Sequence, residues 1–233
     1  PIASGGLLVQ KKFRLAAILC GVLLLVAVGG LSTLYWASQQ VPTFYEEIVA
    51  ADPVGQRRAS DEMLQRSTTL ANDLRREGRW EMLVTAEQIN GWLAVDLVEN
   101  HPEALPETFR DPRVAVGPDT LTVACRYRQG ATTSVLTLTL EPYLSETNCL
   151  SIRIRKARAG LLPVPLAGLL DRVAEAAHEV DLPLKWHDEE GDPVATIPLT
   201  PPDNEDDRRV QIDTLKLSDG KIYIAGTTSR RNR

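Results

Sequence analysis

The sequence predicts an α+β fold: an N-terminal transmembrane helix, then a mainly antiparallel β-sheet packed on one long and one short helix. Three observations predict this class. Residues 15–36 form an uncharged, apolar run, and hydrophobicity with a period of two recurs between residues 113 and 154. Two segments with helical spacing, 85–97 and 165–180, each carry an apolar face. Because such a face must be buried against another element, we expect both helices to cover the sheet.

The uncharged run at 15–36 is long enough to cross a bilayer. It holds 22 residues without a charge, and about 20 apolar residues suffice for a membrane-spanning helix. Three basic residues between positions 11 and 14 directly precede it. The positive-inside rule therefore predicts that residues 1–14 stay in the cytoplasm and that the body lies outside the cytoplasmic membrane, in the periplasm or the extracellular space. A cleaved signal peptide is the alternative, although its apolar core is usually only about 7–15 residues long.

Charge argues against nucleic acid as a partner. The chain has 26 basic and 31 acidic residues, and without the three cations near the N-terminus 23 basic residues remain against 31 acidic, a net charge of −8. A non-specific nucleic-acid binder needs a basic surface that neutralises phosphates. The hydrophobic content of 43% is enough for one ordinary core.

Residues 37–78 are predicted to form a juxtamembrane segment that contains an amphipathic helix at about 58–77. Gly78 ends this helix. The helix either self-associates as a stalk or lies on the folded body, and the second is favoured because its apolar stripe is thin. The stripe repeats at intervals of three and four: Ala59, Met63, Ser67, Leu70 and Leu74.

A short capped helix is predicted to open the folded domain. Thr85 and Gln88 have the spacing of a capping box, in which each side chain bonds the backbone amide of the other residue. Asn90 and Gly91 are poor helix formers near its start. We expect Asn90 to bond backbone groups of an adjoining loop and Gly91 to permit a close approach of another element.

Alternating hydrophobicity predicts four strands between this helix and residue 158. In the third, leucines alternate with threonines, which is typical of a half-buried antiparallel strand: Leu136, Leu138 and Leu140. The fourth, "CLSIRIRKAR", is expected to point Arg153 and Arg155 outward. We read this basic face as a solvent face in preference to an anion or membrane patch.

The long helix at 165–180 begins with Pro165 at its first position. Short strands near 182–187, 194–199 and 208–217 follow, and the last turns through a hairpin into 221–226. The domain is therefore predicted to span residues 79–227, with a basic tail at 228–233.

No motif for catalysis, a metal or a cofactor is present in the sequence. The three histidines lack metal-ligand spacing, and there is no nucleophile elbow, phosphate-binding loop or dinucleotide fingerprint. We expect a protein that is not an enzyme and needs no cofactor. Cys125 reads as a small core residue, and a Cys125–Cys149 disulfide is the less favoured alternative.

Apolar residues offer the remaining functional hypothesis. If the two helices cover the sheet incompletely, a groove lined by leucine and tryptophan would accept a lipid or acyl chain; if they cover it completely, the same residues form the core. These residues are Ile89, Trp92, Leu93, Leu136, Leu138, Leu140, Leu166, Leu170 and Trp186.

Three segments, "TAEQINGWL" (85–93), "ARAGLLPVPLAGLLDRV" (157–173) and "DLPLKW" (181–186), together resemble the YpmS-like family of small membrane-anchored bacterial proteins. The resemblance implies an extracytoplasmic domain with no established activity and a curled sheet wrapped on a long helix, like tubular lipid-binding domains. Residues 41–77 depart from the family's pattern. The motif residues are Thr85, Gln88, Asn90, Gly160, Pro163 and Pro165.

The sequence thus predicts a single-pass, membrane-anchored protein that binds a lipid or acyl chain without catalysis. The alternative is a structural or assembly component of the cell envelope that binds protein partners through the helix at 58–77 and a sheet face. A lipid carrier requires a continuous apolar cavity, whereas a scaffold requires an exposed apolar patch of several hundred Å².

Overall fold

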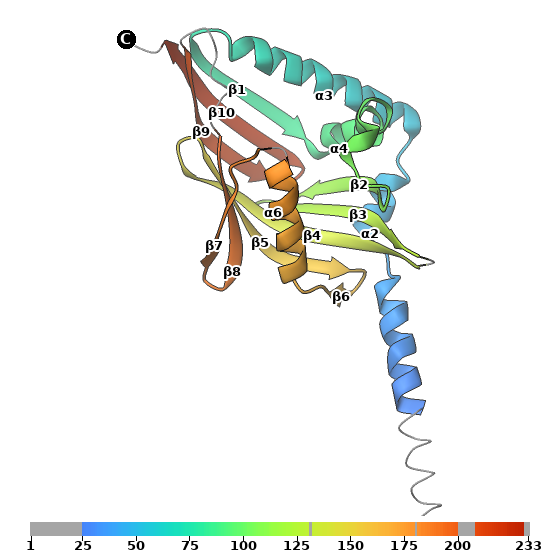
Figure 1. Ribbon diagram of the computed structural model, residues 1–233. Helices are drawn as coiled ribbons and strands as arrows, with labels where there is room; N and C mark the ends of the chain where they lie inside the picture. Colours follow the sequence, from blue (N-terminus) through green and yellow to red (C-terminus); the bar gives the residue numbers. More distant parts are fainter. Residues whose placement is uncertain (1–24, 131, 180, 200–207, 231–233) are drawn as a thin grey trace, which may run out of the picture.

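The computed structural model describes residues 25–130, 132–179, 181–199 and 208–230. Its strands form two antiparallel sheets (Figure 1). The smaller sheet has the order β1-β10-β9, with β1 at Gly78–Thr85, β10 at Lys221–Arg230 and β9 at Arg208–Ser218. The larger sheet has the order β2-β3-β4-β5-β8-β7, with β6 paired to β5; its strands are β2 (Phe109–Val116), β3 (Leu121–Gln129), β4 (Thr132–Glu146), β5 (Cys149–Ala159), β6 (Leu162–Pro163), β7 (Lys185–Glu189) and β8 (Asp192–Pro198).

The helices are spread around the two sheets, with α6 in front of the larger sheet in Figure 1. In Figure 1, α3 lies along the smaller sheet beside β1, and α4 lies next to α3. Residues 25–38 are also helical and lead into this group. The remaining bounds are α2 (Thr43–Val49), α3 (Pro53–Asp73), α4 (Ala86–Ala94), α5 (Asp96–Asn100), a 3-10 turn at Pro102–Ala104 and α6 (Ala167–Glu179).

The mainly antiparallel sheet predicted from the sequence is confirmed, but it is divided in two. Strand β1 was not predicted from the sequence, where Leu83 interrupts the alternation of apolar and polar residues. The single helix predicted at 85–97 is divided into α4 and α5, and α4 ends before Val95. The long helix was placed at 165–180, and α6 begins two residues later, at Ala167.

The transmembrane helix predicted at 15–36 is the part of the fold class that is wrong. No helix in the described part of the chain is both long enough and apolar enough to cross a membrane. Residues 1–24, which include the predicted cytoplasmic segment 1–14, lie outside the described residues. The extracytoplasmic location of the domain stays a prediction.

The segment predicted to be juxtamembrane, 37–78, is packed on the body. Tyr45 on α2 is completely buried, and its hydroxyl donates a hydrogen bond to the Asp111 carbonyl oxygen at 2.8 Å. Burial, followed by the charge of Asp111, raises the pKa of Tyr45 to about 12. Helix α3 packs on α4 and β1. Of the two predicted arrangements for this helix, the structure shows the one in which it lies on the body.

Asn148 joins the two sheets. It occupies the turn between β4 and β5 with a φ of 60°, a left-handed conformation that asparagine tolerates. Its Nδ2 donates to the Val210 carbonyl oxygen at 2.8 Å, and its Oδ1 accepts from the Ile212 amide at 2.6 Å. Both partners belong to β9, so one side chain of the larger sheet satisfies an edge of the smaller sheet.

The prediction that Arg153 faces solvent is wrong. Arg153 is buried and pairs with Glu189 at 2.6 Å, while Arg155 pairs with Glu141 and Asp192 at 2.7 Å each. The hairpin of β7 and β8 supplies two of these carboxylates. Arg153 and Arg155 are therefore both paired with carboxylates of the protein, and Arg155 is exposed, as predicted.

The disulfide considered as an alternative is not formed. Cys125 and Cys149 are both free thiols. Burial raises the pKa of Cys125 to about 11, so this side chain stays a protonated thiol at neutral pH.

Candidate functional site: the groove between α3 and β1

The nine residues predicted to form an apolar groove are all half-buried, but they are spread over several elements. Ile89, Trp92 and Leu93 lie on α4, which packs on α3, β1, β2 and α5. The leucines of the third predicted strand lie on β4, between β3 and β5. Trp186 lies on β7, Leu170 on α6 and Leu166 just before α6. None of the nine lines either of the two pockets described below.

The predicted capping box is formed at the start of α4. The Thr85 hydroxyl accepts a hydrogen bond from the Gln88 amide at 3.1 Å, and the Gln88 side-chain oxygen accepts from the Thr85 amide at 3.1 Å. The box therefore fixes the corner where β1 ends and α4 begins.

Asn90 and Gly91 attach α4 to its two neighbours. The Asn90 amide donates to the Val114 carbonyl oxygen and accepts from the Val114 amide, both at 2.8 Å. The partner is strand β2, where the sequence analysis expected a loop. A Cβ on Gly91 would lie 2.7 Å from Ala59 Cβ and from the backbone of Ser60, so glycine permits the close contact between α4 and α3.

The other motif residues surround the turn between β5 and β6. Gly160 has a φ of 58°, and a Cβ there would lie 2.5 Å from the Ala37 carbonyl oxygen. The Leu161 amide donates to the same oxygen at 3.0 Å, so this turn receives the end of the helix at 25–38. Pro163 and Pro165 follow the turn and are exposed.

Polar contacts bond parts of two sheet edges within the described residues. Asn90 and the Gly220 amide bond Val114 and Val116 of β2, and Asn148 bonds Val210 and Ile212 of β9. Strand β7 is only five residues long and carries charges, which discourages pairing. Strand β1 is the other edge of the smaller sheet: it spans eight residues, and its described strand partner is β10 alone.

The backbone groups of β1 that face this open edge can be identified. The Ala86 amide donates to Gly220 across the sheet, while the Thr85 amide turns away from β10 to the Gln88 side chain. The register between β1 and β10 is unbroken, and amides of an antiparallel strand face alternate sides. The N–H and C=O groups of Glu81 and Leu83 therefore face outward, and they make no hydrogen bond with another described residue.

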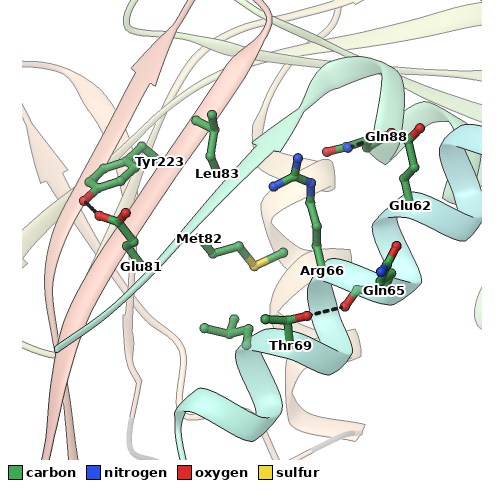
Figure 2. Close-up of a pocket in the computed structure, with 10 residues that line it drawn as sticks. Glu62, Gln65, Arg66, Thr69, Glu81, Met82, Leu83, Gln88 and Tyr223 are labelled. Atoms are coloured by element: carbon green, nitrogen blue, oxygen red, sulfur yellow. Dashed lines mark hydrogen bonds between the residues drawn. The ribbon is translucent and has the colours of Figure 1, made fainter. Parts of the chain in front are cut away.

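A groove of about 470 Å³ lies between this edge and α3 (Figure 2). The chain turns back from α3 into β1 through residues 74–77, so the helix forms one wall and the strand the other. Figure 2 shows the Met82 side chain pointing from β1 toward α3 and the Arg66 guanidinium reaching from α3 into the space between them. The lining residues are Glu62, Gln65, Arg66, Thr69 and Leu70 of α3, Glu81, Met82 and Leu83 of β1, Gln88 of α4 and Tyr223 of β10.

Five of the seven polar side chains that line this groove make a hydrogen bond within the described residues. Gln88 Nε2 donates to Glu62 at 3.0 Å, and the Tyr223 hydroxyl donates to Glu81 at 2.7 Å, a hydrogen bond that raises the pKa of Tyr223. Thr69 bonds the backbone of its own helix. Arg66 alone among the charged lining residues makes no hydrogen bond or ion pair within the described part of the chain.

A second pocket of about 720 Å³ lies between α3, α4 and β2. Its lining is rich in small and aliphatic side chains, with charged residues among them. It contains Glu47, Ile48, Ala51, Asp52, Gly55, Gln56, Arg58, Ala59, Ala86, Glu87, Asn90, Gly91, Val114, Ala115, Val116 and Gly220.

The α3–β1 groove was not predicted from the sequence. Its walls come from four elements, and Tyr223 stands 142 positions after the Glu81 to which it bonds. The one local signal was the helix itself, whose residue Leu70 belongs to the apolar stripe and lines the groove.

The described residues contain no cluster of histidine, cysteine, aspartate or glutamate that could hold a metal ion. The groove offers backbone donors and acceptors of β1, one arginine, two glutamates and three apolar side chains. Searches for similar proteins found no family model, no curated protein and no solved structure that matches this chain, so the resemblance to the YpmS-like family stays a prediction.

Proposed function

We propose that this protein is a non-catalytic interaction module that binds an extended segment of a partner polypeptide in the groove between α3 and β1. The bound segment adds to the smaller sheet as a fourth strand, next to β1. This is the alternative that the sequence analysis raised, in which the protein works through protein partners and uses the helix at 58–77.

One observation carries the proposal: the outward N–H and C=O groups of Glu81 and Leu83 face a groove in place of a neighbouring strand. Only an extended backbone offers donors and acceptors at the matching spacing, and strand addition to an open edge is a recurrent mode of peptide recognition. The groove's polar lining fits an acyl chain poorly, because an apolar ligand leaves the polar groups without partners.

Helix α3 completes the site as a second wall. Its first half is held on α4 by the contact at Gly91 and by the bond between Gln88 and Glu62. Its second half is mostly exposed. A strand that enters the groove would therefore meet a wall fixed at one end and would bury side chains that are now open to water.

The test uses the full chain and short random peptides selected for binding to it, then synthesised. We expect Leu83→Pro to weaken binding by at least about tenfold, because proline removes an outward amide that donates to the ligand. Proline is tolerated at an edge position whose N–H faces solvent, so the sheet should still form. Leu83→Ala keeps the amide and is the matched control.

A second measurement examines the ligand's own backbone. In an added strand every second amide faces β1, so N-methylation at those positions should abolish binding, and methylation at the intervening positions should not. Equal sensitivity at all positions, an unaffected Leu83→Pro variant or a selection that yields no binder would each contradict strand addition.

The pocket between α3, α4 and β2 keeps a second candidate function open, the binding of a lipid or acyl chain. Its volume of about 720 Å³ and its aliphatic lining support this reading. Native mass spectrometry of the gently purified protein should then show a bound lipid. A protein that consistently carries none would count against this candidate and leave the peptide proposal untouched.

A further inference from the structure

The helix at 25–38 is exposed on every side up to Trp36, and it carries no charged residue. Figure 1 shows it standing clear of both sheets. The hydroxyl groups of Ser32 and Thr33 donate to carbonyl oxygens one turn earlier in the same helix, so they need no partner outside it. A helix of this kind fits lipid, which surrounds it on all sides, better than a protein partner that covers one face.

The end of this helix meets the turn between β5 and β6. The Leu161 amide donates to the Ala37 carbonyl oxygen at 3.0 Å, and the neighbouring side chains of both segments are exposed: Leu161 by 56%, Trp36 by 62% and Tyr35 by 59%. Tryptophan and tyrosine are favoured at the boundary between hydrocarbon and water. A lipid layer that surrounds the helix up to these rings would therefore reach Leu161 as well.

The same end of β5 carries exposed cations. Arg158 lies opposite Pro163, just after the turn, and Lys156 is two residues earlier on the same face of the strand. Neither side chain makes a hydrogen bond or ion pair within the described residues. Helix α2 carries two exposed carboxylates, Glu46 and Glu47, but Glu47 lines the pocket beside β2, three strands from β5 in the larger sheet. This end of β5 therefore complements an anionic surface.

We propose that the body of this protein docks on an anionic lipid surface through the β5–β6 turn. Leu161 enters the apolar layer beside the helix at 25–38, while Lys156 and Arg158 pair with phosphate groups of the lipid. This contact does not require a helix that crosses the lipid layer. It is also independent of peptide binding, because Figure 1 places β1 at the far end of the molecule from this helix.

A photo-crosslinking probe reports which side chains touch lipid. The full chain is placed in vesicles of phosphatidylcholine and phosphatidylglycerol, and p-benzoylphenylalanine is introduced at one position at a time. Leu161→p-benzoylphenylalanine should form lipid adducts, which mass spectrometry of the protein detects. Leu182→p-benzoylphenylalanine is the matched control and should form none, because Leu182 is also exposed, by 40%, but follows the far end of α6.

Lipid charge gives a second measurement with the probe at Leu161. A larger fraction of phosphatidylglycerol should raise the yield of adducts, because each basic side chain near an anionic surface adds attraction. The double change Lys156→Glu and Arg158→Glu should abolish this increase. Lys216→Glu with Lys221→Glu is the matched control, since both lysines are exposed on the smaller sheet and the change of charge is the same.

Three outcomes would contradict the inference. Lipid adducts from Leu31→p-benzoylphenylalanine on the helix, with none from the probe at Leu161, would show that the body does not touch the lipid. Cross-links between two copies of the chain at Leu161, in place of lipid adducts, would assign this turn to a protein interface. A yield that does not depend on phosphatidylglycerol would show that Lys156 and Arg158 do not bind the headgroups.

Discussion

Asn90 shows how one side chain closes the edge of a sheet. Its amide presents a donor and an acceptor to Val114 of β2, just as a neighbouring strand would. Both bonds are buried, so water cannot replace them, and a buried polar group without a partner costs about 1–3 kcal/mol. The residue therefore stabilises the protein although it weakens its own helix.

We expect Asn90→Ala to lower the free energy of unfolding by about 2–4 kcal/mol, because it leaves the amide and the carbonyl of Val114 unsatisfied. Urea unfolding followed by circular dichroism measures the change. Asn72→Ala is the control, because Asn72 is an exposed helical asparagine near the end of α3. If the Asn90→Ala protein is as stable as the wild type, the hydrogen bonds from Asn90 to Val114 do not stabilise the fold.

The residues that could be predicted from the sequence are those whose partners lie nearby. The capping box joins Thr85 and Gln88, three positions apart, and it is formed as the spacing indicates. Asn90 was identified as a backbone ligand, but its partner lies 24 positions away and turned out to be a strand. Arg153 was predicted to face solvent. Its partner Glu189 belongs to the β7–β8 hairpin, which lies far from Arg153 in the sequence, so the pattern of β5 alone does not reveal the ion pair. Alternation of apolar and polar residues predicts on which face of the sheet a side chain lies. It does not predict which other element covers that face.

At the scale of elements, the contact between α3 and α4 holds one wall of the groove. The two helices meet at Gly91, where a Cβ would lie 2.7 Å from three atoms of α3. Two of these atoms belong to the backbone, which cannot move aside as a flexible side chain can. The distance between α3 and β1, and so the width of the groove, depends on this contact.

Gly91→Ala should therefore destabilise the protein by about 1–3 kcal/mol even though alanine favours helix formation. Gly55→Ala on α3 is the matched control: its Cβ would meet only Asp52 Oδ2, at 3.7 Å, so it should be neutral or stabilising. Thermal unfolding compares the two variants. We also expect Gly91→Ala to weaken peptide binding, since α3 must shift. Equal melting temperatures for both variants would contradict the tight contact.

Across the whole molecule, the two sheets are held together by a few polar bonds and by packing between β4 and β9. Strand β1 of the smaller sheet forms one wall of the groove. A peptide bound next to β1 would therefore be connected to this junction through β10 and β9. Asn148 is the residue through which the larger sheet bonds β9. If the two sheets are joined mainly at this junction, weakening the junction should increase the local opening of the smaller sheet before that of the larger sheet.

Asn148→Gly tests this, because glycine accepts the φ of 60° and removes only the side-chain bonds to Val210 and Ile212. We expect a loss of about 1–3 kcal/mol in the free energy of unfolding. Hydrogen exchange should quicken in β9, β10 and β1 before it changes in β3 and β4, because the smaller sheet can then open by itself. Asp181→Gly is the control, since Asp181 has a similar φ of 53° and is exposed. A uniform loss of protection in both sheets would show that they unfold as one unit regardless of Asn148.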